Sequence, residues 1–143
     1  MDKKLIDAAR KGNLELVQSL FSQGVNIHAY NDSALICSAM GGYLEIVKYL
    51  VEKGSDIHTN DDESLRFASL NGQFEVIQYF LYDCKMKIKK ETKNWLIENR
   101  QRQTLQLIEK RDSIMKIMKN YEKLNQNIIQ KDSIDNLGKK VKI

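Results

Sequence analysis

Gly12-Asn-Leu-Glu-Leu-Val-Gln-Ser-Leu-Phe-Ser-Gln-Gly24 is followed 30 residues later by a near copy, Gly42-Tyr-Leu-Glu-Ile-Val-Lys-Tyr-Leu-Val-Glu-Lys-Gly54. A third copy begins at Gly72 and ends at Cys84, which replaces the last glycine. Self-similarity at a fixed period of this size is typical of stacked repeats, in which each unit contacts only its neighbours. We therefore expect a solenoid with a binding surface rather than a globule with its own active site.

Each copy reads as the second helix of a helix pair. Its apolar residues fall on one face, as at Leu14, Val17 and Leu20, and glycines at both ends stop the helix. Before each copy lies a shorter segment with small residues, which let a neighbouring helix approach closely; they are Ala8-Ala9, Ser38-Ala39 and Ala68-Ser69. One oxygen-bearing residue recurs just before this inner helix, and we interpret it as an N-cap. These residues are Asp2, Asp32, Asp62 and Thr92.

The densest copy resembles the ankyrin repeat. Leu35 to Ala39 matches its small-residue inner helix, and Gly42-Tyr-Leu-Glu-Ile-Val matches its outer helix. The resemblance covers about residues 1–88. Ankyrin units usually have a longer period, and the residues missing here come from the connector, which predicts a short, blunt loop in place of the usual β-hairpin. A 30-residue period in a chain rich in Lys, Asn and Ile is similar to the ankyrin arrays of giant viruses that infect amoebae.

The fold class that follows is all-α. We expect an ankyrin-like helix-turn-helix solenoid of three units, at about residues 1–30, 31–60 and 61–90, with a divergent fourth at 91–102. A long amphipathic C-terminal helix should follow at 103–131, and a basic, disordered tail at 132–143.

The resemblance implies non-catalytic protein binding through the connectors and the concave surface of the inner helices. In ankyrin proteins the contacts come from connector tips and from the two residues before the helix-breaking glycine. Transferred by position, the partner-binding residues are Arg10, Lys11, Tyr30, Asn31, Asp32, Met40, Gly41, Asn60, Asp61, Asp62, Leu70 and Asn71. Viral ankyrin proteins often end in an F-box-like segment, but this tail has neither a proline nor the Leu-Pro start of such a box.

The charge of the chain is divided between its two parts. Residues 1–83 hold 7 Lys or Arg against 12 Asp or Glu, a net charge of −5, and residues 84–143 hold 16 against 7, a net charge of +9. The basic third could bind nucleic acid or an anionic surface through phosphate contacts. Aromatic residues for base stacking are nearly absent there, so a solvated lysine face is the commoner reading.

Catalysis, a metal and a cofactor are not expected. The chain has no Gly-rich phosphate loop and no nucleophile motif. His28 and His58 share one repeat phase, and stacked helices lie too far apart for them to share a metal. Cys37 and Cys84 read as reduced thiols, and the chain starts without an apolar signal segment. We expect a cytoplasmic or nuclear protein that is not secreted and does not span a membrane.

The C-terminal helix carries apolar residues at about 3.5-residue spacing, which is the period of a coiled-coil seam. They are Leu107, Ile114, Ile117, Tyr121, Leu124 and Ile128. Three heptads with Lys110 in the seam are short for a stable dimer, so a monomer or a weak dimer is expected. The alternative, packing back on the solenoid, is favoured for residues 103–113 only.

Overall fold

The computed structural model describes the backbone of residues 1–140 and the side chains of residues 1–134. It divides into two compact units, Met1–Leu107 and Ile108–Ile143, which are described separately. The first unit holds α1 (Asp2–Arg10), α2 (Leu14–Ser22), α3 (Ala29–Gly41), α4 (Leu44–Glu52), α5 (Thr59–Leu70), α6 (Phe74–Gln78), the π-helical turn η1 (Tyr79–Asp83), α7 (Lys90–Glu98) and the start of α8 (Arg102–Lys140). Residues 1–140 contain no strand, so the expected all-α class is confirmed.

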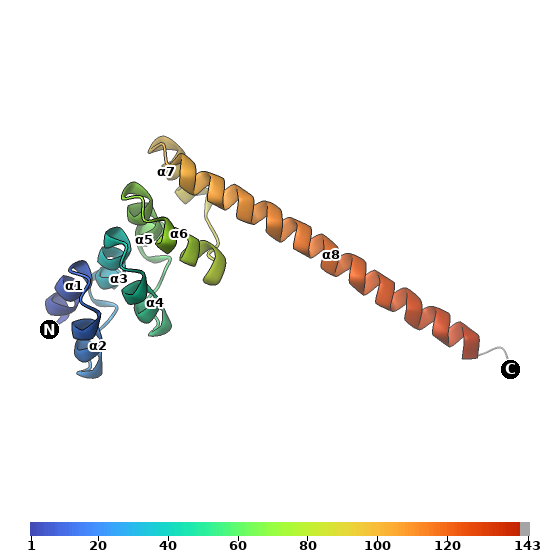
Figure 1. Ribbon diagram of the computed structural model, residues 1–143, viewed down its shortest axis with the longest axis horizontal. Coiled ribbons are helices and arrows are strands. Elements are labelled where there is room, and N and C mark those ends of the chain that lie inside the picture. Colours follow the sequence, from blue (N-terminus) through green and yellow to red (C-terminus); the bar gives the residue numbers. More distant parts are fainter. Residues whose placement is uncertain (141–143) are drawn as a thin grey trace. The chain divides into compact units, whose positions relative to one another are not determined.

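The first unit is a stack of helix pairs (Figure 1). The pairs are α1 with α2, α3 with α4, and α5 with α6, and the inner helices α1, α3, α5 and α7 contact one another in that order. The core repeats with the sequence, because equivalent residues of successive units are buried, such as Leu5, Leu35 and Leu65. This arrangement confirms the expected solenoid of helix pairs.

Glycines make the turn between the two helices of each pair. Gly12, Gly42 and Gly72 all have positive φ, between 66° and 74°, which a residue without a Cβ adopts at little cost. Space matters as well, since a Cβ added to Gly12 would lie 2.5 Å from Cε1 of Tyr43 in the next unit. Each of the first two turns is thus covered by the residue that follows the next glycine, Tyr43 over Gly12 and Gln73 over Gly42.

The connectors between pairs contain a short left-handed turn. Tyr30, Asn31 and Asp32 all have φ between 53° and 56°, and residues 60–62 repeat this conformation with φ between 48° and 61°. The right-handed parts of α3 and α5 begin only after these residues. These turns join successive pairs where other ankyrin repeats have a β-hairpin, and residues 1–140 contain no strand. The blunt loop expected from the 30-residue period is the form observed.

The four residues interpreted as N-caps do not cap helices through their side chains, so that interpretation is wrong. Asp2 is the first residue of α1 and makes no cap hydrogen bond, and Thr92 lies inside α7. Asp32 and Asp62 lie in the left-handed turns. A side chain in that conformation no longer points along the following helix, and it is free to bond to other connectors.

The third pair ends differently from the first two. Gly24 and Gly54 end their helices with positive φ, and Val25 N–H and Ser55 N–H bond back to Leu20 and Leu50. In the third pair the turn η1 inserts one residue, so Met86 N–H bonds to the Phe80 carbonyl at 3.0 Å. Lys85 then takes the left-handed position with a φ of 51°.

The divergent fourth inner helix, α7, packs mainly through Leu96, which is fully buried. Trp95 is half-buried and lies under the guanidinium of Arg66, whose Cζ is 5.3 Å from the ring centroid. Ile97, two residues after Trp95, is 60% exposed. The start of α8 is tied to α5, because Thr104 Oγ1 and Ser69 Oγ are 3.1 Å apart and both side chains are buried.

Helix α8 extends from Arg102 to Lys140, beyond the expected end at about residue 131. Most of the segment expected to be disordered is therefore helical, and residues 141–143 lie outside the described residues. Polar turn formers such as Ser133 are accommodated, since its Oγ donates a 2.8 Å hydrogen bond to the Ile129 carbonyl one turn earlier.

Candidate functional site

Asp32 and Asp62 each tie their own connector to the next unit of the stack. Oδ1 of Asp32 lies 3.0 Å from Nδ1 of His28 and accepts from the backbone N–H of Asp56 in the next connector at 3.3 Å. Oδ1 of Asp62 lies 2.6 Å from Nδ1 of His58, and Oδ2 accepts from the Thr92 hydroxyl at 2.6 Å. Burying a carboxylate costs much free energy unless its oxygens are hydrogen-bonded, as they are here.

These two carboxylates are only 5% and 0% exposed, so the structure removes Asp32 and Asp62 from the surface that a partner can reach. The rings of His28 and His58 are partly exposed, but Nδ1 of each ring contacts the buried carboxylate of its own connector. The His28–Asp32 and His58–Asp62 pairs therefore recur at the same place in successive repeats for a structural reason.

The remaining predicted residues lie on the surface or close to it. Those that are exposed are Arg10, Lys11, Tyr30, Asn31, Gly41, Asn60, Asp61, Leu70 and Asn71. Met40 is half-buried, and its carbonyl accepts a 3.2 Å hydrogen bond from Nε2 of Gln73. Leu70, the equivalent residue of the next unit, is 47% exposed.

A hollow of about 370 Å³ between α1 and α3 brings two predicted residues together. Arg10 and Tyr30 both line it, with Lys3, Ile6, Asp7, Ser33 and Cys37. Nη2 of Arg10 lies 3.6 Å from Sγ of Cys37, and Nη1 lies 3.4 Å from Oδ1 of Asp7. The guanidinium is therefore held at the wall of the hollow. The ring of Tyr30 is 61% exposed, so it can contact a group that enters.

Sequence reasoning missed several residues of this inner surface. Ile6 and Ser33 line the hollow, and Ile97 presents an apolar side chain at the far end of the row of inner helices. A signal existed for Ile97, because it shares its repeat phase with residues 7, 37 and 67, and Asp7 and Cys37 line the hollow. The ankyrin pattern points only to connector tips and to the two residues before each helix-breaking glycine, and Ile6, Ser33 and Ile97 are neither.

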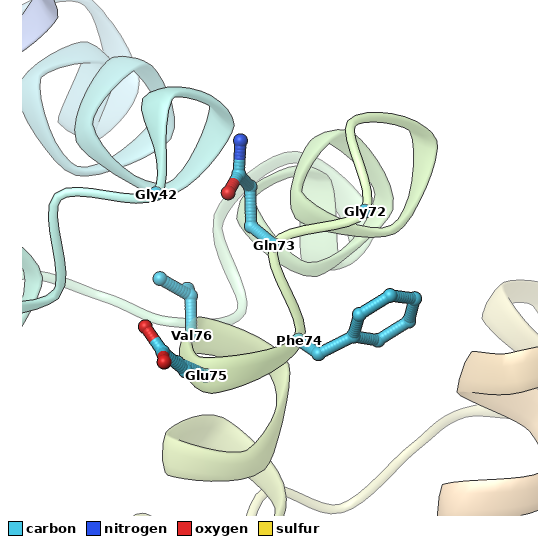
Figure 2. Close-up of a pocket in the computed structure, with 6 residues that line it drawn as sticks. All are labelled: Gly42, Gly72, Gln73, Phe74, Glu75 and Val76. Carbon is cyan, nitrogen blue, oxygen red and sulfur yellow. The ribbon is translucent and has the colours of Figure 1, made fainter.

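A second, smaller hollow of about 200 Å³ lies at the glycine turns of the second and third pairs. Figure 2 shows Gln73 between Gly42 and Gly72, with its amide directed toward Gly42 and the ring of Phe74 directed away. Glu75 and Val76 complete the lining, and none of the twelve predicted residues takes part. The Gln73 amide serves the contact between pairs, so this hollow belongs to the packing of the stack.

Two groups at the end of the third pair have raised pKa values. Burial and then the neighbouring Cys84 thiol raise the pKa of Tyr79 above its ordinary value. Burial also raises the pKa of the Cys84 thiol; a hydrogen bond with Tyr79 offsets part of this effect, and the Asp83 carboxylate adds to it. Both groups stay protonated at neutral pH, which suits a packing role.

Within the described residues no group of three or more His, Cys, Asp and Glu side chains is placed to hold a metal ion. The same part of the chain has no helix that is long and apolar enough to cross a membrane.

Comparison with known proteins bears directly on the repeats. No curated protein matches this chain. A family model described as ankyrin repeats (3 copies) matches residues 5–94, which is more than half of the chain and runs from within α1 to within α7. The chain therefore belongs to the ankyrin repeat family.

Proposed function

We propose that the chain is a non-catalytic scaffold that binds a partner protein with the exposed side of its inner helices and the tips of its connectors. Ankyrin repeats are in general protein–protein interaction modules, and solenoids of this kind bind along an extended surface. A rigid array also orders few groups on binding, so little of the contact free energy is lost.

The observation that carries the proposal is the exposure of large side chains on the inner helices and on the left-handed connector turn at the start of α3. Tyr30 stands at the hollow beside Arg10, and tyrosine and arginine are among the residues that most often dominate the free energy of binding at interfaces. Leu70 and Ile97 continue the surface with apolar side chains that nothing in the described residues covers fully. Together these residues offer anchors of the type that binding interfaces use.

The partner-binding set that we propose contains the exposed predicted residues with Met40, and it leaves out Asp32 and Asp62 because both are buried. The protein would act in the cytoplasm or nucleus, and in a host cell if the resemblance to viral arrays reflects its source. That resemblance rests on the period and composition of the chain.

The test is capture of proteins from a cell lysate by the immobilised full chain, quantified by mass spectrometry. Tyr30→Asn with Leu70→Asp should remove the specifically captured protein while the helical circular dichroism stays the same. Asparagine suits the left-handed backbone at position 30. Leu16→Asp is the matched control, because Leu16 is 42% exposed but lies on the outer helix α2. Equal loss in both variants, or capture unchanged by the double variant, would contradict the proposal.

A second candidate function is association of the basic third with nucleic acid or another anionic surface. In the irregular segment after η1, Met86 is buried while Lys85, Lys87 and Lys89 are exposed. Three lysines thus lie at the surface of one short stretch, and Nζ of Lys89 is 3.8 Å from Oδ1 of Asp61. Binding to duplex DNA that weakens steeply with salt, and a salt slope that falls by about 0.9 for each lysine replaced by glutamine, would support it. Absence of binding at low salt would eliminate it.

A further inference from the structure

The part of α8 in the second unit has an exposed apolar stripe. Ile114, Ile117, Tyr121, Leu124 and Ile128, here called the α8 seam, are each between 41% and 65% exposed. Their spacing alternates between three and four residues, which keeps all five on one face of a helix. Stripes of this kind are normally covered in a folded protein.

The exposure extends all round this part of the helix, because every side chain from Asp112 to Ile134 is exposed. A helix in water without tertiary contacts is only marginally stable, and this one has β-branched isoleucines and several asparagines, which favour helices weakly. The helix therefore gains most of its stability from whatever covers the α8 seam.

The distribution of charged residues around the α8 seam indicates what kind of surface can cover it. The positions that border the α8 seam carry no charge between its ends; they are Ser113, Met118, Asn120, Asn125 and Asn127. Lys116, Lys119 and Lys123 lie on the opposite face of the helix. An identical helix can thus approach the seam without repulsion between like charges, although the C-terminal third is strongly basic.

The same placement argues against an anionic membrane or nucleic acid as the occupant of the seam. A helix that lies on a membrane surface has its lysines at the borders of the apolar face, where they reach the headgroups. Here the borders hold neutral amides, a serine and a methionine, and the lysines point away from the apolar face. Asparagine side chains at the borders suit contact with a second polar helix edge.

We infer that the α8 seam is the interface of a parallel, two-stranded coiled coil between two copies of this chain. Ile114, Tyr121 and Ile128 occupy one of the two core positions of the heptad, and Ile117 and Leu124 occupy the other. Isoleucine at the first position with leucine at the second favours two parallel strands. Ile114, Ile128 and Leu124 follow this pattern, whereas Tyr121 and Ile117 do not. Lys110 and Lys131 occupy core positions on either side, so the seam is short and the dimer dissociates on dilution.

In a parallel pair the N-terminal ends of the two α8 helices lie together, and each is joined to its own ankyrin stack. The dimer therefore offers two copies of the same binding surface. A partner with two sites would then be bound more tightly than by one chain, through effective concentration. The dimer itself does not depend on the proposed function, because the seam lies outside the residues proposed to bind the partner.

Sedimentation equilibrium of the full chain tests the interface. The mass should rise with concentration from 16.6 kDa toward twice that value. Ile117→Lys with Leu124→Lys should weaken self-association by more than about tenfold, since each change places a charge in the seam. Lys116→Gln with Lys123→Gln is the control and should leave self-association within about twofold, as expected for exposed positions on the far face. A monomer at all concentrations, or a dimer that survives the seam changes, would overturn the inference.

Disulfide trapping tests the orientation in a chain with Cys37→Ala and Cys84→Ala. Lys110→Cys and Lys131→Cys variants should each form a homodimer disulfide, because equivalent core positions face each other in a parallel pair. The two variants are also mixed in equal amounts. If the mixture forms mainly a disulfide between position 110 of one chain and position 131 of the other, the pair is antiparallel and the assignment is overturned. Vesicles with phosphatidylserine test the competing occupant, and binding that needs the seam without any dimer in solution would replace the dimer by a membrane surface.

Discussion

The hydroxyl of Thr92 donates a 2.6 Å hydrogen bond to Oδ2 of Asp62, across 30 residues of sequence. Both side chains are buried, and the other carboxylate oxygen lies 2.6 Å from Nδ1 of His58. One carboxylate thus holds its own connector and the next inner helix together. The position of Asp62 in the stack makes it a structural residue, although its phase in the repeat is that of a surface contact.

Asp62→Asn should lower the free energy of unfolding by about 2 kcal/mol, because a buried charged acceptor with two partners is replaced by an amide that can accept through only one oxygen. Urea unfolding followed by circular dichroism measures this. The neighbouring Asp61 has the same left-handed backbone but a side chain that is 78% exposed. Asp61→Asn should leave the midpoint unchanged, and equal effects at the two positions would refute the role of the buried network.

Gly42→Ala should destabilise the chain more than Gly54→Ala. Both glycines have positive φ, so alanine costs about 1–2 kcal/mol at either. A Cβ at Gly42 would also collide with the amide of Gln73, whereas nothing lies within 4 Å of one at Gly54. Displacing Gln73 breaks its hydrogen bond to Met40. The extra loss, read from urea midpoints, should disappear in a Gln73→Ala background.

Lys85→Gly should stabilise the third pair. Lysine pays the steric cost of a left-handed backbone at this position, and glycine does not, which leaves a net gain of about 0.5–1 kcal/mol after the entropy of the unfolded chain is included. Thermal unfolding measures the gain. Lys87→Gly is the control in the same exposed segment and should give no gain, since Lys87 is not among the residues with positive φ.

The Cys84 thiol should react with iodoacetamide more slowly than an ordinary thiol at pH 8. Burial raises its pKa, and only the thiolate reacts. Mass spectrometry of the Cys84 peptide measures the alkylation rate as a function of pH. The pH at half-maximal rate should be higher in the folded chain than in a control unfolded in urea. Asp83→Asn should shift the midpoint down, because the Asp83 carboxylate contributes to the raised pKa. Above the ordinary thiol pKa the unfolded chain loses this proton first, so stability falls as pH rises.

The sequence predicted the parts of the fold that each unit specifies by itself. Glycine positions, helix pairs and the buried leucines repeat with the period, since each follows from local backbone freedom and from an apolar stripe. The roles of Asp32 and Asp62 were predicted wrongly, because an oxygen before a helix is a common cap, and its alternative partners belong to other units. The hydrogen bonds of Asp56 and Thr92 to these carboxylates join residues far apart in the sequence, so they are seen only in the structure.

The candidate site was predictable to a similar extent. Transfer from the ankyrin pattern placed Arg10, Tyr30 and Leu70 on the surface, where the structure has them. The ankyrin pattern did not predict the hollow between α1 and α3, because its size depends on the distance between the side chains of the two helices. The end of α8 was also missed, because turn-forming residues such as Ser133 stop a helix less strongly than proline, and the chain has no proline.

The change from aspartate to threonine at position 92 has a consequence for how the array can grow. A spliced duplicate of residues 31–60, placed after residue 60, would bring its own carboxylate, histidine and glycines, and it would meet compatible neighbours on both sides. A duplicate placed after residue 98 would follow α7, where Thr92 provides no carboxylate and its hydroxyl is already bonded to Asp62. The residue before α7 also lacks the left-handed backbone of the other connectors. Lengthening should therefore succeed in the interior of the chain and fail at the threonine end.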